Sequence, residues 1–425
     1  MKIWRARSTV ERRLSPRMRG DASRPRGVLG RFSLLGRVWR DQTYRTFLLL
    51  MVLMSLAASS GLPLIALFLV RDMGVGLSTA SLFFIGTAAP GLVLGIMLGR
   101  RSDRWRSRLP FIVFATIWLG VGWFMLALSP FAWLTLSVGA LFLSFGGVLM
   151  GQLYAALHDV MTAQGETQPG LINTTIRTGF SFGFVLGPVG GSILATTAGL
   201  RAAFVVAGCL YFLCLALLRD LSLPSIVHTT APPKAEQRAD RPVLVFAVLC
   251  ALALSGQTVR NTYLSIYVTT RLGGSLADFG FLIAVCPLVE LAAMPLAGVL
   301  AERIDLGRLI AGGLVVGTIE YLCVALSNAL WQLYVTQAMD ACVVAVLLGL
   351  GMTYAQRLSP TRPGAASSLF FSASNLSNIV GGVVGSAAVP LLGVPHVFFL
   401  PALLCGLAWM MKLSVERGAV GAPSL

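Results

Sequence analysis

Residues 99–108 read GRRSDRWRSR, a short basic stretch between two long apolar runs. Residues 298–308 read GVLAERIDLGR and follow an apolar run in the second half of the chain. In each stretch a glycine is followed four residues later by an acid and then by an arginine. The matching residues are Gly99, Asp103 and Arg104 in the first stretch, and Gly298, Glu302 and Arg303 in the second. This pattern indicates that the chain contains two copies of one unit.

A second match supports the repeat. Residues 184–192 read FVLGPVGGS and residues 378–386 read NIVGGVVGS. Gly187, Gly191 and Ser192 of the first correspond to Gly381, Gly385 and Ser386 of the second. Both matches have nearly the same offset, so we interpret the chain as two related halves.

The composition identifies a membrane protein. Hydrophobic residues make up 56% of the 425 residues and charged residues 12%, about half the charged share of a soluble domain. The apolar residues form blocks of the length that crosses a bilayer as a helix. Twelve blocks are expected: 46–70, 78–99, 110–128, 132–157, 170–197, 200–218, 243–269, 277–301, 307–327, 330–357, 363–391 and 394–413. The predicted fold class is an all-α membrane protein with twelve transmembrane helices in two pseudo-symmetric six-helix halves.

Five segments follow from these blocks. The predicted organisation is a disordered basic tail (1–45), an N-terminal half (46–218), a linker (219–242), a C-terminal half (243–413) and a short C-terminal tail (414–425). The linker is charged and rich in proline, as linkers between domains often are.

The positive charges predict the orientation. The formal net charge is +16, and 13 of the 33 Lys and Arg precede the first apolar block. Only Arg71, Arg201 and Arg271 fall in loops on the opposite side. Because positive residues remain on the cytoplasmic side, we expect both termini and the linker there, in a bacterial inner membrane. The basic tail is expected to contact lipid rather than nucleic acid.

The loop at 99–108 also resembles the signature loop of the major facilitator superfamily, Gly-x-x-x-Asp-Arg-x-Gly-Arg-Arg/Lys. Gly99, Asp103, Arg104 and Arg108 match this pattern, whereas Arg106 and Ser107 depart from it. The resemblance implies the major facilitator fold. Independently, the acid is suited to accept hydrogen bonds from a helix N-terminus or to pair with arginine, which would latch helices together. For Arg108 the favoured interpretation is a simple topogenic charge.

The fifth block holds a ladder of glycines. Gly179, Gly183, Gly187 and Gly191 are spaced by four residues, and Pro188 interrupts the block. Such a stripe permits close helix packing and would suit a gate, although small-residue packing alone explains it too. The run GPVGG (187–191) resembles the superfamily's antiporter motif, which implies export.

Arg177 lies on a different face of the same block. Asn173 shares that face. A charged residue inside the membrane usually faces a bundle interior or a wet cavity, so we expect both residues to line a substrate cavity. The alternative is an arginine that extends to the membrane surface.

Three segments resemble the sugar efflux transporter family within that superfamily. They are residues 176–188, 284–304 and 349–386. This resemblance implies proton-driven export of sugars or sugar-like compounds. The chemistry of the residues leaves a drug or metabolite exporter open, because 23 phenylalanines are present. A membrane sensor that transports nothing is a weaker alternative.

Charged residues inside the blocks are the candidates for proton coupling. We predict Glu290 as the proton carrier, with Asp340 as second candidate and Arg260 as the partner that links protonation to helix position. The alternative for either acid is a permanent pair with Arg260. Glu320 is expected to face lipid or to have a packing role.

Polar side chains within the blocks suit the hydroxyl groups and ring faces of a sugar. Besides Arg177 and Asn173, the predicted cavity residues are Gln152, Tyr154, Gln257, Asn261, Tyr263, Asn375 and Asn378. Each of them also fits a role in helix–helix contact.

Several classes of protein are disfavoured. None of the three lysines follows a glycine, which excludes a Walker A nucleotide site, and no HExxH zinc motif occurs. The seven cysteines show no metal-binding spacing. We therefore expect no cofactor, no metal and no enzyme activity. The expected partners are a small-molecule substrate, protons and lipid, for a monomeric protein.

Overall fold

The computed structural model describes residues 38–102, 107–166, 169–219, 221–224, 241–359 and 363–420. All regular secondary structure within these ranges is helical. Twelve helical spans there are long and apolar enough to cross a membrane. The predicted fold class is confirmed. The prediction was possible because each apolar run has the length of one membrane span, so the number of runs gives the number of spans.

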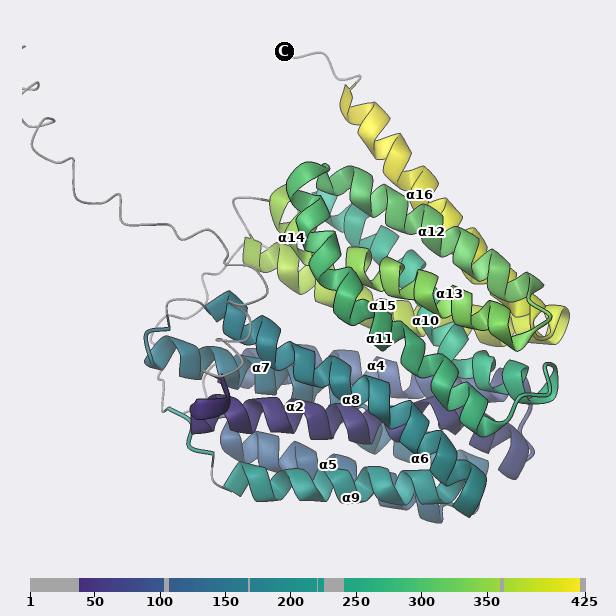
Figure 1. Cartoon of the computed structure of the whole chain (residues 1–425), viewed down its shortest axis with the longest axis horizontal. Helices are drawn as coiled ribbons and strands as arrows, with labels where there is room; N and C mark the ends of the chain where they lie inside the picture. Colours follow the sequence, from purple (N-terminus) through teal and green to yellow (C-terminus); the bar gives the residue numbers. More distant parts are fainter. Residues whose placement is uncertain are drawn as a thin grey trace, which may run out of the picture.

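The first half forms the lower part of the molecule in Figure 1. Its elements are α2 (Gln42–Gly61), η1 (Leu62–Leu64), α3 (Ile65–Leu67), η2 (Phe68–Asp72), α4 (Leu77–Ser102), α5 (Leu109–Leu128), α6 (Ala132–Val138), η3 (Gly139–Leu143), α7 (Phe145–Ala163), α8 (Pro169–Ala198) and α9 (Leu200–Arg219). The elements from α6 to α7 form one continuous span, and η3 is a π-helical turn in its middle.

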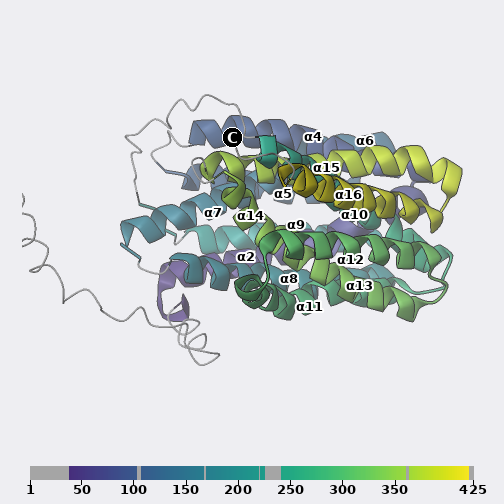
Figure 2. The ribbon, with the colours of Figure 1, turned by 90° about the horizontal axis from the view of Figure 1, so that it is seen from above.

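The second half lies above the first. Its elements are α10 (Arg241–Thr270), α11 (Leu276–Arg303), α12 (Leu306–Leu326), α13 (Leu330–Val344), η4 (Ala345–Leu350), α14 (Gly351–Leu358), α15 (Pro363–Leu392), η5 (His396–Phe398) and α16 (Phe399–Val420). The span from α13 to α14 again contains a π-helical turn, η4. Figure 2 shows that the helices of both halves run along one common direction.

Two helix ends differ from the sequence prediction. Helix α2 begins at Gln42 because the Asp41 carboxylate accepts hydrogen bonds from the backbone N–H groups of Thr43 and Tyr44, at 2.9 and 3.1 Å. Residues 42–45 thus belong to the first span, not to the basic tail. At the other end α16 continues to Val420, so most of the predicted C-terminal tail is helical. Residues 1–37 and most of the linker lie outside the described ranges.

The glycine ladder of α8 packs against α2. A Cβ atom on Gly183 would lie 2.5 Å from the Val52 carbonyl oxygen and closer still to the Ser55 hydroxyl. Gly187 faces Ser59 in the same way. The Ser59 hydroxyl also lies 3.2 Å from the carbonyl oxygen of Gly183, to which it donates. The ladder therefore brings two backbones together inside the first half.

The second half repeats this contact. Helix α15 packs along α10, as α8 packs along α2. A Cβ atom on Gly381 would meet the backbone of Ser255 and lie 2.8 Å from the Thr258 Cβ. Gly385 sits 3.0 Å from the Tyr263 ring by the same measure. Glycines that correspond in sequence therefore make corresponding helix contacts, which supports the interpretation of two related halves.

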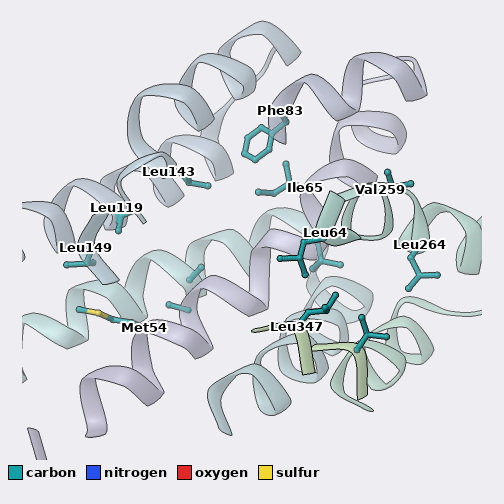
Figure 3. Packing of buried hydrophobic residues seen from close by; sticks show 14 of the residues in the cluster. Met54, Leu64, Ile65, Phe83, Leu119, Leu143, Leu149, Val259, Leu264 and Leu347 are labelled. Atoms are coloured by element: carbon teal, nitrogen blue, oxygen red, sulfur yellow. The ribbon is translucent and has the colours of Figure 1, made fainter. Parts of the chain in front are cut away.

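The halves meet through α8 against α11 and through α4 against α15. A Cβ atom on Gly280 would lie 2.6 Å from the Pro188 carbonyl oxygen, and one on Gly382 would press on Ile85. Figure 3 shows the buried Leu64 and Ile65 of the first half beside Val259 of α10. All of these contacts lie toward one end of the bundle, opposite to the end at which α2 begins and α16 finishes.

We predict that Gly183→Ala destabilises the protein, because the added methyl group must push α2 away from α8. The expected loss is about 1–3 kcal/mol, typical of an overfilled contact. Thermal unfolding in detergent would measure it. Gly190→Ala is the matched control, since a Cβ there meets nothing within 4 Å and the site is exposed. Equal unfolding temperatures for the two variants would contradict the prediction.

Candidate functional site

Arg260 forms a buried ion pair with Asp340. The Arg260 Nη1 atom lies 2.5 Å from Asp340 Oδ2, and Nη2 donates to Oδ1 at 2.6 Å. Arg260 is 2% exposed and Asp340 is 3% exposed. The pair joins α10 to α13 in the middle of their spans. A fully desolvated pair of this geometry favours the two helices in one arrangement.

Neighbouring side chains add hydrogen bonds to the pair, although the Arg260 Nε and Nη1 atoms have no hydrogen-bond partner among the described residues. Gln257 donates to Asp340 Oδ1 at 2.7 Å, and the Cys286 thiol of α11 lies 3.1 Å from Oδ2. Arg260 Nη2 also donates to the Tyr321 hydroxyl at 3.0 Å. Gln257, predicted as a cavity residue, thus contacts the ion pair.

Glu320 was expected to face lipid or to have a packing role, and the lipid-facing alternative is wrong. It is fully buried, and its Oε1 atom lies 3.7 Å from Arg260 Nη2. Helix α12 packs against α13 and α16 and also contacts α10, which encloses this carboxyl group. The sequence contained no pattern that could show which face of α12 is enclosed, because glycines and apolar residues occur all around it.

Glu290 stands apart from this cluster. It is half-buried on α11, and the charged group that acts on it most strongly is Arg177 of α8. Asp340 acts on it more weakly. Helices α8 and α11 belong to different halves and pack together. Of the two interior arginines, the one opposite Glu290 is therefore Arg177 and not Arg260.

The N-terminal cavity candidates divide into two groups. Asn173 and Arg177 are exposed on α8, and the charge of Arg177 also acts on the half-buried Tyr154 of α7. Gln152 is instead buried, and its Oε1 accepts a hydrogen bond from Arg108 at 3.0 Å. Arg108 in turn pairs with Asp159 at 2.8 Å. Arg108 is therefore more than a topogenic charge. The sequence signal for its ion pair was Asp159, an acid near the same end of another span.

The C-terminal cavity candidates divide in the same way. Asn261 and Asn375 are exposed within their helices. Asn378 accepts a hydrogen bond from Thr258 at 2.9 Å, which joins α15 to α10. Tyr263 is fully buried, and its hydroxyl lies 3.4 Å from the carbonyl oxygen of Leu77 in the other half. In this conformation Tyr263 contributes to the contact between the halves.

The repeated loop motif is only partly visible. Gly99 lies near the end of α4, whereas Asp103 and Arg104 lie outside the described residues. Glu302 and Arg303 are exposed at the end of α11. A Cβ atom on Gly298 would meet nothing within 4 Å among the described residues, so no other described helix packs closely on this glycine. In the described ranges, no three His, Cys, Asp or Glu side chains are grouped as metal ligands would be.

We predict that Arg260→Ala destabilises the protein by about 3–5 kcal/mol, because Asp340 would lose the positive charge with which it is paired in the buried interior. Thermal unfolding in detergent would measure the loss. Arg271→Ala, at an exposed position just after the same helix, is the control. Equal unfolding temperatures for the two variants would contradict the assignment.

Comparison with known proteins supports this arrangement of helices. The sequence model of the Major Facilitator Superfamily matches residues 47–270 and 245–424. A "Putative sugar efflux transporter" from Deinococcus radiodurans is 30% identical over 87% of this chain and 97% of its own length. "Sugar efflux transporter A" from Escherichia coli is 25% identical over 88% of this chain and 96% of its own length.

More distant relatives include a "Multidrug resistance protein MdtG" from Escherichia fergusonii, which is 22% identical over 72% of this chain and 76% of its own length. Among solved structures, the nucleoside transporter NupG superimposes with a TM-score of 0.74 at 12% identity, over 89% of this chain and 99% of that one. This likeness concerns the fold alone. The chain belongs to the Major Facilitator Superfamily and is a multi-pass membrane transporter related to the sugar efflux transporters.

Proposed function

We propose that the protein exports sugars or sugar-like small molecules in exchange for protons by alternating access. The observation that carries the proposal is the position of Glu290 and Arg177 on opposite sides of the contact between the halves. An ionised Glu290 attracts Arg177, and a protonated Glu290 does not. Proton binding would thus change the free energy with which the two halves hold together.

The packing of the halves is consistent with a transporter open at one end. The inter-half contacts at Gly280, Gly382 and Tyr263 all lie remote from the chain termini. Toward the termini, Asn173 and Arg177 of α8 are exposed. The distribution of Lys and Arg supports a cytoplasmic location of the termini. We therefore infer a conformation that opens toward the cytoplasm and is closed on the outer side.

A sugar is the substrate class best supported by the side chains and the relatives. Arg177, Asn173, Tyr154, Asn261 and Asn375 stay accessible or half-accessible within the spans. Amides and a guanidinium pair well with hydroxyl groups, and a tyrosine ring packs on the C–H face of a sugar. The relatives from Deinococcus radiodurans and Escherichia coli are named as sugar efflux transporters.

A multidrug exporter is the second candidate. The rings of Phe180 and Phe184 lie on α8 with centroids 4.8 Å apart and planes tilted by 31°, close in sequence to Arg177. Aromatic rings offer a large apolar area to a lipophilic molecule. The relatedness to MdtG supports the same alternative. Efflux assays in proteoliposomes with radiolabelled sugars and with dyes would distinguish the two substrate classes.

We predict that Glu290→Gln abolishes efflux driven by a pH gradient, because glutamine has no ionised form and cannot release a proton. Substrate binding should remain largely intact. Uptake into inverted membrane vesicles would measure transport, and equilibrium binding would measure affinity. Asp72→Asn, at an exposed position at the end of η2, is the control. Gradient-driven transport at the normal rate in Glu290→Gln would exclude this residue as the proton carrier.

We predict that Gly280→Leu prevents closure of the outer side, since the new side chain would clash with the Pro188 carbonyl and with Ser192. Transport should fall, and a cysteine at position 192 should react faster with an impermeant maleimide. The measurement needs a chain whose seven native cysteines are replaced. Gly312→Leu on α12 should change neither property, because the position is exposed and a Cβ atom there meets nothing within 4 Å among the described residues. Unchanged labelling in Gly280→Leu would contradict the proposed closure.

A further inference from the structure

Glu320 is a buried acid to which the proposed coupling assigns no role. Its side chain is 1% exposed in the interior of α12. Neither of its carboxylate oxygens accepts a hydrogen bond from any group in the part of the chain that the structure describes. An ionised carboxylate in such a place is strongly unfavourable, whereas a protonated carboxyl is far less so.

Among the described residues, Arg260 is the only positive charge near Glu320, and it is already paired. Arg260 contacts both Asp340 oxygens at 2.5 and 2.6 Å and donates to Tyr321 at 3.0 Å. Its distance to Glu320 is 3.7 Å, beyond hydrogen-bonding range. Arg260 thus neutralises Asp340 in this conformation and leaves Glu320 without a bonded counterion.

The surrounding helices add no second cation. The titratable groups that interact electrostatically with Glu320 or with its partners come from five helices. They are Arg260 from α10, Asp340 from α13, Tyr321 from α12 itself, Cys405 from α16 and Cys286 from α11. The π turn η4 contains no titratable side chain. Tyr354 and Arg357 of α14 and Lys412 of α16 lie toward the chain termini, and His396 of η5 lies at the opposite end. One positive charge therefore serves two carboxyl groups.

We propose that Glu320 is a second proton-carrying residue, which holds a proton in this conformation and competes with Asp340 for Arg260. A small movement of α10 or α13 would transfer the guanidinium from Asp340 to Glu320. Glu320 would then lose its proton, and Asp340 would gain one, so that the charge of the cluster is unchanged. The inference rests on the proposed proton-coupled export and adds to it a buried residue that holds a proton.

The cluster has a connection to the contact between the halves. Cys286 lies against Asp340, and Glu290 follows Cys286 by four residues on α11. Residues spaced by four lie on one face of a helix. The charge of Asp340 acts both on the buried Glu320 and on Glu290, on which Arg177 acts with the opposite sign. A proton that moves from Glu320 to Asp340 therefore reaches a residue that also interacts with Glu290.

Infrared spectroscopy of the purified protein tests the protonation directly. The wild type should show the carbonyl stretch of a buried, protonated carboxyl group that persists at alkaline pH. Glu320→Gln should lack this band, and Glu302→Gln, an exposed acid, should retain it. Asp340→Asn should also lack the band, because Arg260 is then free to pair with an ionised Glu320. A merely structural Glu320 would keep the band in Asp340→Asn, which would overturn the proposal.

Transport assays complete the test. Glu320→Gln should lose efflux driven by a pH gradient but retain substrate exchange without a gradient, because exchange needs no net proton release. Normal gradient-driven efflux in this variant would overturn the proposal. The infrared result does not depend on which substrate the protein carries. A failure of Glu290→Gln to affect transport would count against the proposed function, whereas an unchanged infrared band in Glu320→Gln would count against the role of Glu320 alone.

Discussion

Hydrocarbon neither hydrogen-bonds to backbone amides nor solvates charge, and this constraint governs the whole chain. It makes every span helical and requires each interior charge to find a partner within the protein. Arg260 meets the requirement with Asp340, and Arg108 meets it with Asp159. The first pair connects two spans that are distant in sequence, and the second connects consecutive spans. The ionic contacts therefore hold particular helices together, while apolar packing supplies most of the contact area.

Close backbone contact is the second organising element. Within the first half, serines of α2 lie against glycines of α8, and within the second half α10 meets α15 in the same manner. The contact between the halves is of a different kind, because Gly280 of α11 meets the carbonyl of Pro188 on a face of α8 different from that of the glycine ladder. Each half is thus tightly packed internally and joined to the other along fewer helices. This is the arrangement expected of two bodies that rock against each other.

The fold was largely predictable from the sequence, since runs of apolar residues have the length of a membrane span and their number fixes the topology. The candidate site was less so. Arg260 and Asp340 were identified because charges in apolar runs are rare, but their pairing depends on tertiary contacts that no local pattern encodes. For that reason the sequence left open whether Glu320 faces lipid or is packed inside, and Gln152 was expected at a cavity although it binds Arg108. The start of α2 was missed because a single capping carboxylate, that of Asp41, extends the helix beyond its apolar run.

The π turns η3 and η4 lie in the fourth and the tenth span, but η3 begins seven residues into its span and η4 fifteen. A π turn accommodates one surplus residue, so the helix beyond it is rotated by about 100° relative to an uninterrupted α-helix. Asp340 lies five residues before η4. The surplus residue in η4 therefore sets which face α14 presents to its neighbours, relative to the face of α13 that carries Asp340.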